Sequence, residues 1–329
     1  THVHTDNSLD AKGLGVMLGP EEAYHFARGE EVTTSHGLPF RLSRPLDWLV
    51  VADHSDGMGA MKEIIAGNPN LLKDATVKEW HAAIRKGGET AFKTTMEVIL
   101  AFTEGKVPAV VLDRTFQQTV WDDYIEIADR YNEPGRFTAM IGYEWTSVPK
   151  GNNLHRNVIF RDGAQKAGQI VPFTTQAPVG STDPLELYKY LENYEARTGG
   201  SALALAHNGN LSNGLMFDTF KLDSDELLDA DYATRRARWE PLYEVTQMKG
   251  DGEAHPMLSP DDAFADFETW DKGQLGPNPK TPDMIPNEYA REALKRGLAH
   301  QAELGVNPFK FGMVGSTDSH TALATTQED

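Results

Sequence analysis

Histidines and carboxylates stand at the ends of short apolar runs throughout this sequence. The run 48–52 ends in Asp53 and His54, and the run 202–206 ends in His207. Imidazole and carboxylate groups are the ligands with which proteins hold divalent transition metals. The residues at such positions are His2, His4, Asp53, His54, Glu144, His155, His207, Asp318 and His320. We expect a metal centre assembled from distant parts of the chain, as in a metal-dependent hydrolase.

The pair His2 and His4 opens this series. On a strand, residues i and i+2 point the same way, so both imidazoles could reach one metal ion. Alternatively, both histidines are exposed to solvent near a frayed end. The pair alone is weak evidence, because a chain with 11 histidines often contains two of them at this spacing by chance.

The next positions could also have purely structural roles. Asp53 and His54 follow five apolar residues, and a buried strand rarely ends in two ionisable groups that have no use. Asp53 could instead cap the helix expected after it, and Glu144 could form a salt bridge with a residue such as Arg156. A lone His155 would more often be structural. The joint occurrence of these residues, rather than any one of them, indicates a site.

The apolar runs predict seven buried strands that alternate with helical patterns. The strands are expected at about 1–4, 47–53, 138–144, 155–160, 202–207, 241–246 and 309–316. The clearest helices are expected at about 20–28, 113–132, 183–199 and 288–304. Strands that alternate with helices form parallel sheets, and in a barrel their carboxyl ends share one rim. The sequence therefore predicts an α/β fold with a closed or nearly closed barrel.

The spacing of these elements is irregular. Residues 57–136 contain only helical patterns, so a large helical insertion is expected after the second strand. The loop 271–287 contains four prolines and is expected to be irregular and exposed. No repeat or linker divides the chain, so residues 1–329 are expected to form a single domain. A strand that delivers His2 to a barrel rim needs residues before it, and we expect the natural polypeptide to extend beyond both ends.

Charge and composition limit the kinds of partner. The net charge of −18, from 31 Lys and Arg against 49 Asp and Glu, argues against a nucleic-acid partner. A small anionic substrate fits, because bound metal ions reverse the field locally. The sequence contains no uninterrupted apolar stretch of about 18 residues, so no membrane span is predicted. The absence of cysteine excludes disulfides and thiol nucleophiles, and it fits a periplasmic or secreted protein, which we expect here.

The residues above occur in ordered motifs that resemble those of the PHP superfamily, named after polymerase and histidinol phosphatase. The motifs are 2–5 with Ser8 and Asp10, then 52–54, 142–144, His155, 206–207 and 316–320. The stretches 151–160 and 206–214 also resemble a bacterial PHP-like subgroup of unknown function, whose members are often longer and exported. The resemblance spans residues 2–320 and implies a distorted seven-stranded (β/α) barrel with a trinuclear metal site.

The resemblance also implies which residues bind the metals. Three groups would each bind one ion: His2, His4, Glu144 and Asp318; Asp10, His54 and His320; and Glu144, His155 and His207. Glu144 would bridge two ions. Asp6 could replace Asp10, because the spacing after the first motif varies in the superfamily. Glu244 could orient a ligand from outside the site, or it could serve packing or a salt bridge.

The expected activity follows from this ligand set. Mixed imidazole and carboxylate ligands suit zinc, manganese or iron, and two to three divalent ions are expected. A water between two ions would ionise near neutral pH and attack phosphorus, with Glu144 and Asp318 as catalytic residues. The expected function is hydrolysis of small phosphate mono- or diesters. Loops just past the strands of a barrel usually select the substrate. The expected substrate-binding residues in such loops are Asn208, Lys249 and His255.

Two other functions stay open from the sequence. The chain could be a metal-binding accessory domain without turnover, although intact ligands at all nine positions favour catalysis. It could also hydrolyse a non-phosphate ester, an amide or a sulfate. The oligomeric state is not indicated by the sequence.

Overall fold

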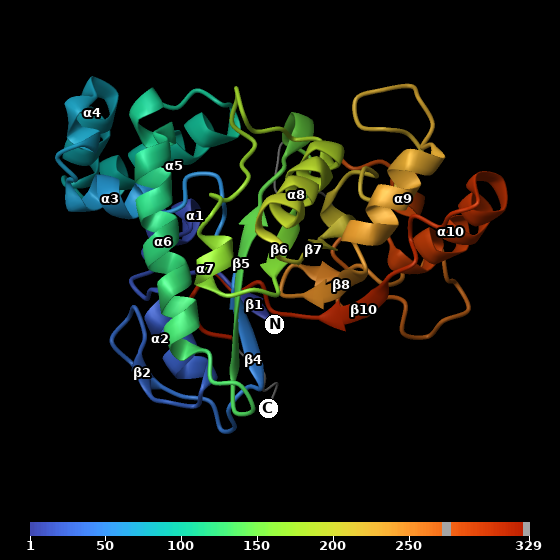
Figure 1. Cartoon of the computed structure of the whole chain (residues 1–329), viewed down its shortest axis with the longest axis horizontal. Coiled ribbons are helices and arrows are strands. Elements are labelled where there is room, and N and C mark those ends of the chain that lie inside the picture. Colours follow the sequence, from blue (N-terminus) through green and yellow to red (C-terminus); the bar gives the residue numbers. More distant parts are fainter. Residues whose placement is uncertain (272–277, 325–329) are drawn as a thin grey trace. The chain divides into compact units, whose positions relative to one another are not determined.

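The structure is a computed structural model that describes residues 1–271 and 278–324 (Figure 1). It is a mixed α/β structure, which confirms the predicted class. Its internal contacts divide it into two compact units. The first comprises Thr1–Trp145, Ile159–Gly180 and the stretch from Asp318, and the second comprises Thr146–Val158 and Ser181–Thr317. Seven of the nine predicted metal ligands belong to the first unit.

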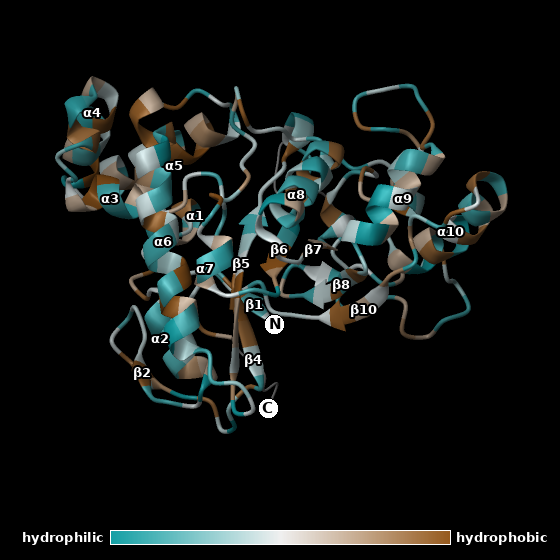
Figure 2. Cartoon of the chain, in the orientation of Figure 1, coloured by the Kyte–Doolittle hydropathy of each residue, from teal (hydrophilic) through white to brown (hydrophobic). Residues whose placement is uncertain are grey.

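Three parallel strands form the sheet of the first unit: β1 (His2–Val3), β4 (Trp48–Val51) and β5 (Thr138–Trp145). His2 pairs with Val50 and Leu49 pairs with Ala139, so β4 lies between the other two strands. Residues 49–51 are fully buried, and their hydrophobic character is visible on β4 in Figure 2. Such a continuous apolar run is typical of a parallel strand that is covered on both faces.

The described part of this unit contains seven α-helices. They are α1 (Leu9–Gly13), α2 (Pro20–Ala27), α3 (Ala60–Ala66), α4 (Ala75–Ile84), α5 (Gly88–Thr103), α6 (Arg114–Tyr131) and α7 (Ala164–Ala167). Four of them, α3 to α6, lie in the long connection from β4 to β5. Helices α2 and α6 pack against each other and against β4 and β5 respectively. A separate core, with Ile64, Trp80 and Val98 among its buried residues, holds the helices of the connection together. The first unit therefore has a core of its own beside the sheet.

The second unit has its own parallel sheet of β7 (Ala202–His207), β8 (Leu242–Gln247) and β10 (Gly312–Gly315). The short β9 (Gly250–Asp251) runs antiparallel to β8. Its helices are α8 (Pro184–Thr198), α9 (Ala230–Trp239) and α10 (Ala290–Leu304). The rings of Phe217, Tyr243 and Phe309 meet in its core. Strand β6 (Arg156–Phe160) contains the boundary between the units.

The elements agree closely with the sequence-based predictions. All seven expected strands occur, and the four expected helices correspond to α2, α6, α8 and α10. The hairpin of β2 (Val32–Thr33) and β3 (Pro39–Phe40), strand β9 and helices α1, α7 and α9 were not predicted. Part of the predicted loop 271–287, residues 272–277, lies outside the described residues. Among the described residues, no helix combines the length and apolar character needed to cross a bilayer.

A buried ion pair stabilises the second unit. Arg156 Nε donates to Glu240 Oε1 at 2.9 Å, and Arg236 lies 3.1 Å from Glu240 Oε2. The Tyr188 hydroxyl also donates to Glu240. Burial opposes ionisation of Glu240, but the two guanidinium groups outweigh it and lower its pKa. Glu240 is therefore charged at neutral pH and holds two buried cations in place.

We predict that Glu240→Gln lowers the free energy of unfolding by about 3–5 kcal/mol, because it leaves two buried guanidinium groups without a counter-charge. Glu186→Gln removes an exposed partner of Lys189 and should change it by no more than about 0.5 kcal/mol. Denaturant unfolding of both variants and the wild type checks this expectation. Equal effects of the two substitutions would contradict it.

The effect of Glu240→Gln on the free energy of unfolding should also depend on pH. The folded-state pKa of Glu240 lies below its ordinary value of 4.5. The stabilisation of the fold by the ionised carboxylate is therefore complete above that pH. It is lost as the pH falls below 4.5 and through the lower folded-state pKa. The difference in unfolding free energy between wild type and Glu240→Gln should therefore be constant near pH 7 and shrink in acid. A difference that grows in acid would show that another group dominates.

Candidate metal centre

Four predicted ligands converge in the interior of the first unit. His2, His4, Glu144 and Asp318 have side chains that are at most 4 % exposed, and their ligand atoms all lie within 4.8 Å of one another. His4 Nε2 lies 2.8 Å from Glu144 Oε2 and 3.0 Å from Asp318 Oδ1. His2 Nε2 lies 3.5 Å from the same Asp318 oxygen. This group could hold a metal ion.

A second group adjoins the first. Asp10 Oδ2 lies 3.5 Å from His54 Nε2 and 3.2 Å from His320 Nε2. The ring of His4 stacks on that of His320 with centroids 4.0 Å apart, and His4, His54 and His320 form a further set of close ligand atoms. Glu144 Oε2 also lies 3.4 Å from His54 Nδ1. Glu144 thus contacts both groups, and Asp318 Oδ1, which faces His2 and His4, also lies 3.7 Å from His320 Nδ1.

Strand pairing explains how these side chains meet. The parallel pairing of β4 with β5 continues past β4, so His54 forms a bridge with Glu144. Glu144 N donates to Asp53 O at 3.0 Å, and Ser55 N donates to Glu144 O at 2.8 Å. The carboxyl ends of parallel strands lie at one edge of a sheet, and each strand of this unit therefore delivers a ligand there.

The ligands near residue 320 arrive by pairing with the first strand. Asp318 N donates to His2 O at 3.2 Å, and His4 N donates to Ser319 O at 2.8 Å. Asp318 has a φ of 50°, in the left-handed region that few residues other than glycine adopt. Backbone strain of this kind is tolerated where function requires a particular side-chain direction. Here it accompanies a carboxylate that faces His2 and His4.

The two groups differ in their electrostatics. Burial, together with the neighbouring His320 and His54, lowers the pKa of His4 and keeps its imidazole neutral. Burial also disfavours the imidazolium of His54, but Glu144 and Asp10 overcome this and raise its pKa to about 9. Burial opposes ionisation of Asp10, yet His54 and His320 hold its pKa well below the ordinary value. The site thus combines an ionised Asp10 and a neutral His4 with a protonated His54, whose proton a metal ion would displace on binding.

A hydrogen-bond relay sets the tautomer of His4. Asp53 is buried and accepts hydrogen bonds from Thr5 N, Thr5 Oγ1 and Ser8 Oγ, each at 2.6 Å. Because the Ser8 hydroxyl donates to Asp53, it can only accept at His4 Nδ1, 2.8 Å away. His4 therefore carries its proton on Nδ1. Its Nε2 lone pair faces Glu144 and Asp318, where a cation would lie.

The contacts of three carboxylates define their roles at the site. Asp53 belongs to the relay, so it neither caps a helix nor joins the ligands. Asp6 does not replace Asp10, because its carboxylate lies 3.4 Å from Lys12 and 3.0 Å from Lys62. Arg156, the salt-bridge partner that the sequence also offered to Glu144, lies 2.9 Å from Glu240 in its own unit.

The remaining predicted ligands belong to the second unit. The rings of His155 and His207 lie 5.8 Å apart in an edge-on arrangement. His207 Nδ1 lies 3.3 Å from Asn157 Nδ2, and Glu244 stands opposite His207 in the register of β7 and β8. A third ion, which would also need Glu144, stays a prediction.

The predicted substrate-binding residues are held by local contacts. Asn208 has a φ of 54° and accepts a hydrogen bond from Gln247 at 3.0 Å. Lys249 N donates to Gln247 Oε1 at 2.9 Å. Both ring nitrogens of His255 are engaged, because Nε2 lies 2.9 Å from Asp271 Oδ2 and Nδ1 accepts from the backbone N of Met257. His255 thus organises its loop, which weakens its candidacy as a substrate ligand.

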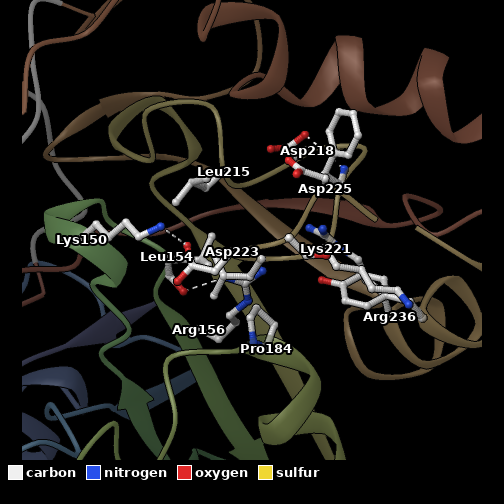
Figure 3. Close-up of a pocket in the computed structure, with 14 residues that line it drawn as sticks. Lys150, Leu154, Arg156, Pro184, Leu215, Asp218, Lys221, Asp223, Asp225 and Arg236 are labelled. Carbon is white, nitrogen blue, oxygen red and sulfur yellow. Dashed lines mark hydrogen bonds and ion pairs between the residues drawn. The ribbon is translucent and has the colours of Figure 1, made fainter. Parts of the chain in front are cut away.

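The second unit also contains a cavity of about 450 Å³ beside α8 and α9 (Figure 3). Each of the four cations that line it has a carboxylate partner. Lys150 lies 2.5 Å from Asp223, Lys221 lies 2.7 Å from Asp229, and Arg156 and Arg236 share Glu240. Its walls are balanced in charge, so they do not indicate an anionic or a cationic ligand.

We predict that Ser8→Ala weakens metal binding about 10- to 100-fold, because His4 then loses the acceptor that places its proton on Nδ1. Ser8→Thr keeps the hydroxyl and should restore most of the affinity. Chelator competition measures the affinity, and nitrogen-15 NMR of the His4 ring reports its tautomer.

Ser55→Ala is the matched control. Ser55 is also buried and lies next to His54, but its hydroxyl makes no hydrogen bond to any described residue. This variant should bind metal like the wild type. Unchanged affinity in Ser8→Ala would show that the relay does not act on the site.

Comparison with known proteins places the chain in a family. No curated protein and no solved structure matches its sequence. The match to a family description covers residues 1–329, which is the whole chain. The chain therefore belongs to the family described as "Protein of unknown function (DUF3604)".

Proposed function

We propose that this protein is a metal-dependent hydrolase, and specifically a phosphoesterase that acts on small phosphate mono- or diesters. The observation that carries the proposal is the surroundings of His4 Nε2. This atom is fully buried and lies within 3.0 Å of two carboxylate oxygens, and within the described residues it forms no hydrogen bond. A cation among these three ligands would satisfy all of them. The ordered motifs that resemble the PHP superfamily support the same proposal.

The proposal extends to the metals and the fold. His2, His4, Glu144 and Asp318 would hold one divalent ion, and Asp10, His54 and His320 a second; His155 and His207 would help to hold a third. Zinc, manganese and iron fit this ligand set best. The seven strands would form the distorted seven-stranded (β/α) barrel of the superfamily, with the ligands at one rim.

The residues of the chain have separate roles in this proposal. Ions at the site would supply an ionised water at neutral pH and positive charge for a phosphoryl group. Glu144 contacts both ligand groups of the first unit, so it would keep them at a fixed separation. Asp318 would accept a proton from the attacking water. The relay from Asp53 through Ser8 would keep His4 neutral and oriented throughout.

The charge of the chain supports a small substrate. At −18, the protein repels long polyanions, whereas metal ions bound by the ligand groups could neutralise one phosphoryl group. A substrate with a single phosphate therefore suits the protein better than a polymer.

We predict that the purified protein contains two to three transition-metal ions per chain, measured by elemental analysis. Glu144→Ala should lower the metal content per chain and lower kcat/KM by more than about 100-fold, which exceeds the effect usual for a residue that only orients a ligand. Asp10→Ala should release one ion and leave the other ligand group intact. A folded Glu144→Ala variant with full metal content and near-normal turnover would refute the site.

We also predict that metal-loaded protein hydrolyses aryl and nucleoside phosphates. The expected result in a screen of phosphomonoesters, phosphodiesters and sulfate esters is activity on the small phosphate esters, abolished by chelation and restored by zinc or manganese. Activity confined to sulfate esters, or to long DNA or RNA, would exclude this substrate class. Metal binding without turnover of any ester would identify an accessory domain.

A further inference from the structure

The ligand groups of the first unit are open to solvent on one side. The side chains of Asp10, His320 and His54 are 32, 25 and 12 % exposed, whereas those of His2, His4, Glu144 and Asp318 are at most 4 % exposed. A molecule that reaches the buried ligands from solvent therefore passes Asp10 and His320. The residues beside Asp10 are the first that the rest of such a molecule meets.

Leu14 stands beside Asp10 at this opening. Leu14 N donates to Asp10 O at 2.8 Å, so the two residues are one helical turn apart on the same face of α1. Helical side chains lean toward the N-terminus and cover the preceding turn, which here begins at Asp10. Leu14 is nevertheless 64 % exposed. An apolar side chain thus borders the open edge of the ligands without packing against the core.

Further exposed apolar residues lie on α5, the helix against which α1 packs. Gly13, the residue before Leu14, packs so closely on α5 that a Cβ atom there would lie 2.5 Å from Thr95 Cγ2. Helix α5 exposes Phe92, Met96 and Leu100 at four-residue spacing, by 59, 43 and 53 %. Residues at this spacing form one stripe on a helix. Groups of exposed apolar residues of this kind usually mark binding sites.

We propose that Leu14, together with the exposed stripe of the neighbouring α5, binds the non-phosphoryl part of the substrate, and that the natural substrates are phosphate esters of apolar alcohols or phenols. This inference rests on the proposed function. Hydrolysis of such an ester breaks its P–O bond, and water supplies the hydroxyl group of the phosphate and the proton of the released alcohol. An apolar leaving group adds no charge, which suits a protein that carries a net charge of −18.

The experiment compares hexyl phosphate with methyl phosphate on metal-loaded protein. Each buried methylene strengthens binding by up to about fourfold, so partial burial of five added methylenes should raise kcat/KM more than about tenfold, mainly through KM. Leu14→Ser should reduce the hexyl-to-methyl ratio at least about fivefold while the metal content stays the same. Phenyl phosphate and Leu100→Ser show whether the preferred group is short and aromatic or long and aliphatic.

Leu38→Ser is the matched control, because Leu38 is 66 % exposed in the same unit and lies in the β2–β3 hairpin. It should leave the ratio unchanged. A ratio that responds equally to both variants, or a wild-type ratio near one, would overturn the inference and leave the proposed function standing. Concentration-dependent dimerisation that Leu14→Ser abolishes would overturn it too, since a second copy would then cover the surface.

Failure of the proposed function can be recognised separately. If no phosphate ester is hydrolysed, that function fails, and calorimetric binding of hexylphosphonate and methylphosphonate still tests the apolar surface. Tighter binding of hexylphosphonate that Leu14→Ser weakens, but Leu38→Ser does not, would support the surface by itself. Equal binding of the two phosphonates would overturn it.

Discussion

Two buried carboxylates that approach one imidazole nitrogen are the constraint on which the rest of the first unit depends. Glu144 and Asp318 lie within 3.0 Å of His4 Nε2 in a place that solvent does not reach. Buried charges are costly unless a counter-charge is nearby. A single imidazole has one proton to offer, and in His4 the relay through Ser8 places that proton on the other nitrogen. A cation among these three groups would therefore satisfy both carboxylates and the imidazole nitrogen.

The surrounding structure keeps these groups apart from water and in register. Parallel strands β4 and β5 bring His54 and Glu144 side by side. The fully buried residues of β4 exclude water beneath them. The left-handed backbone at Asp318 turns its carboxylate toward the same place. The strand pairing positions His54 and Glu144, and the backbone conformation positions Asp318. The site is therefore held by several parts of the first unit and not by one loop.

The long apolar strands were predictable because a parallel strand that is buried on both faces has a nearly continuous run of hydrophobic residues. The same signal located His54, Glu144 and His207, each of which follows such a run. Strands β2, β3 and β9 have only two residues each, which is too short to show any periodicity. The position of Asp53 resembles that of a ligand, so only hydrogen-bond geometry could distinguish its actual role. His255 was ambiguous for a related reason, since its partner Asp271 is brought to it by the folding of a loop.

The pairing of the first strand with the stretch from Asp318 has a consequence for the entropy of the chain. His2 and Asp318 are far apart in sequence, yet their side chains are ligands of the same group. An ion held by both would act as a cross-link that closes residues 2–318 into a loop. Cross-links over about 100 residues already stabilise a fold by roughly 4–5 kcal/mol in the chain-entropy description, and a bound ion adds stability by mass action. The metal supply of its surroundings would then govern how long the folded protein survives.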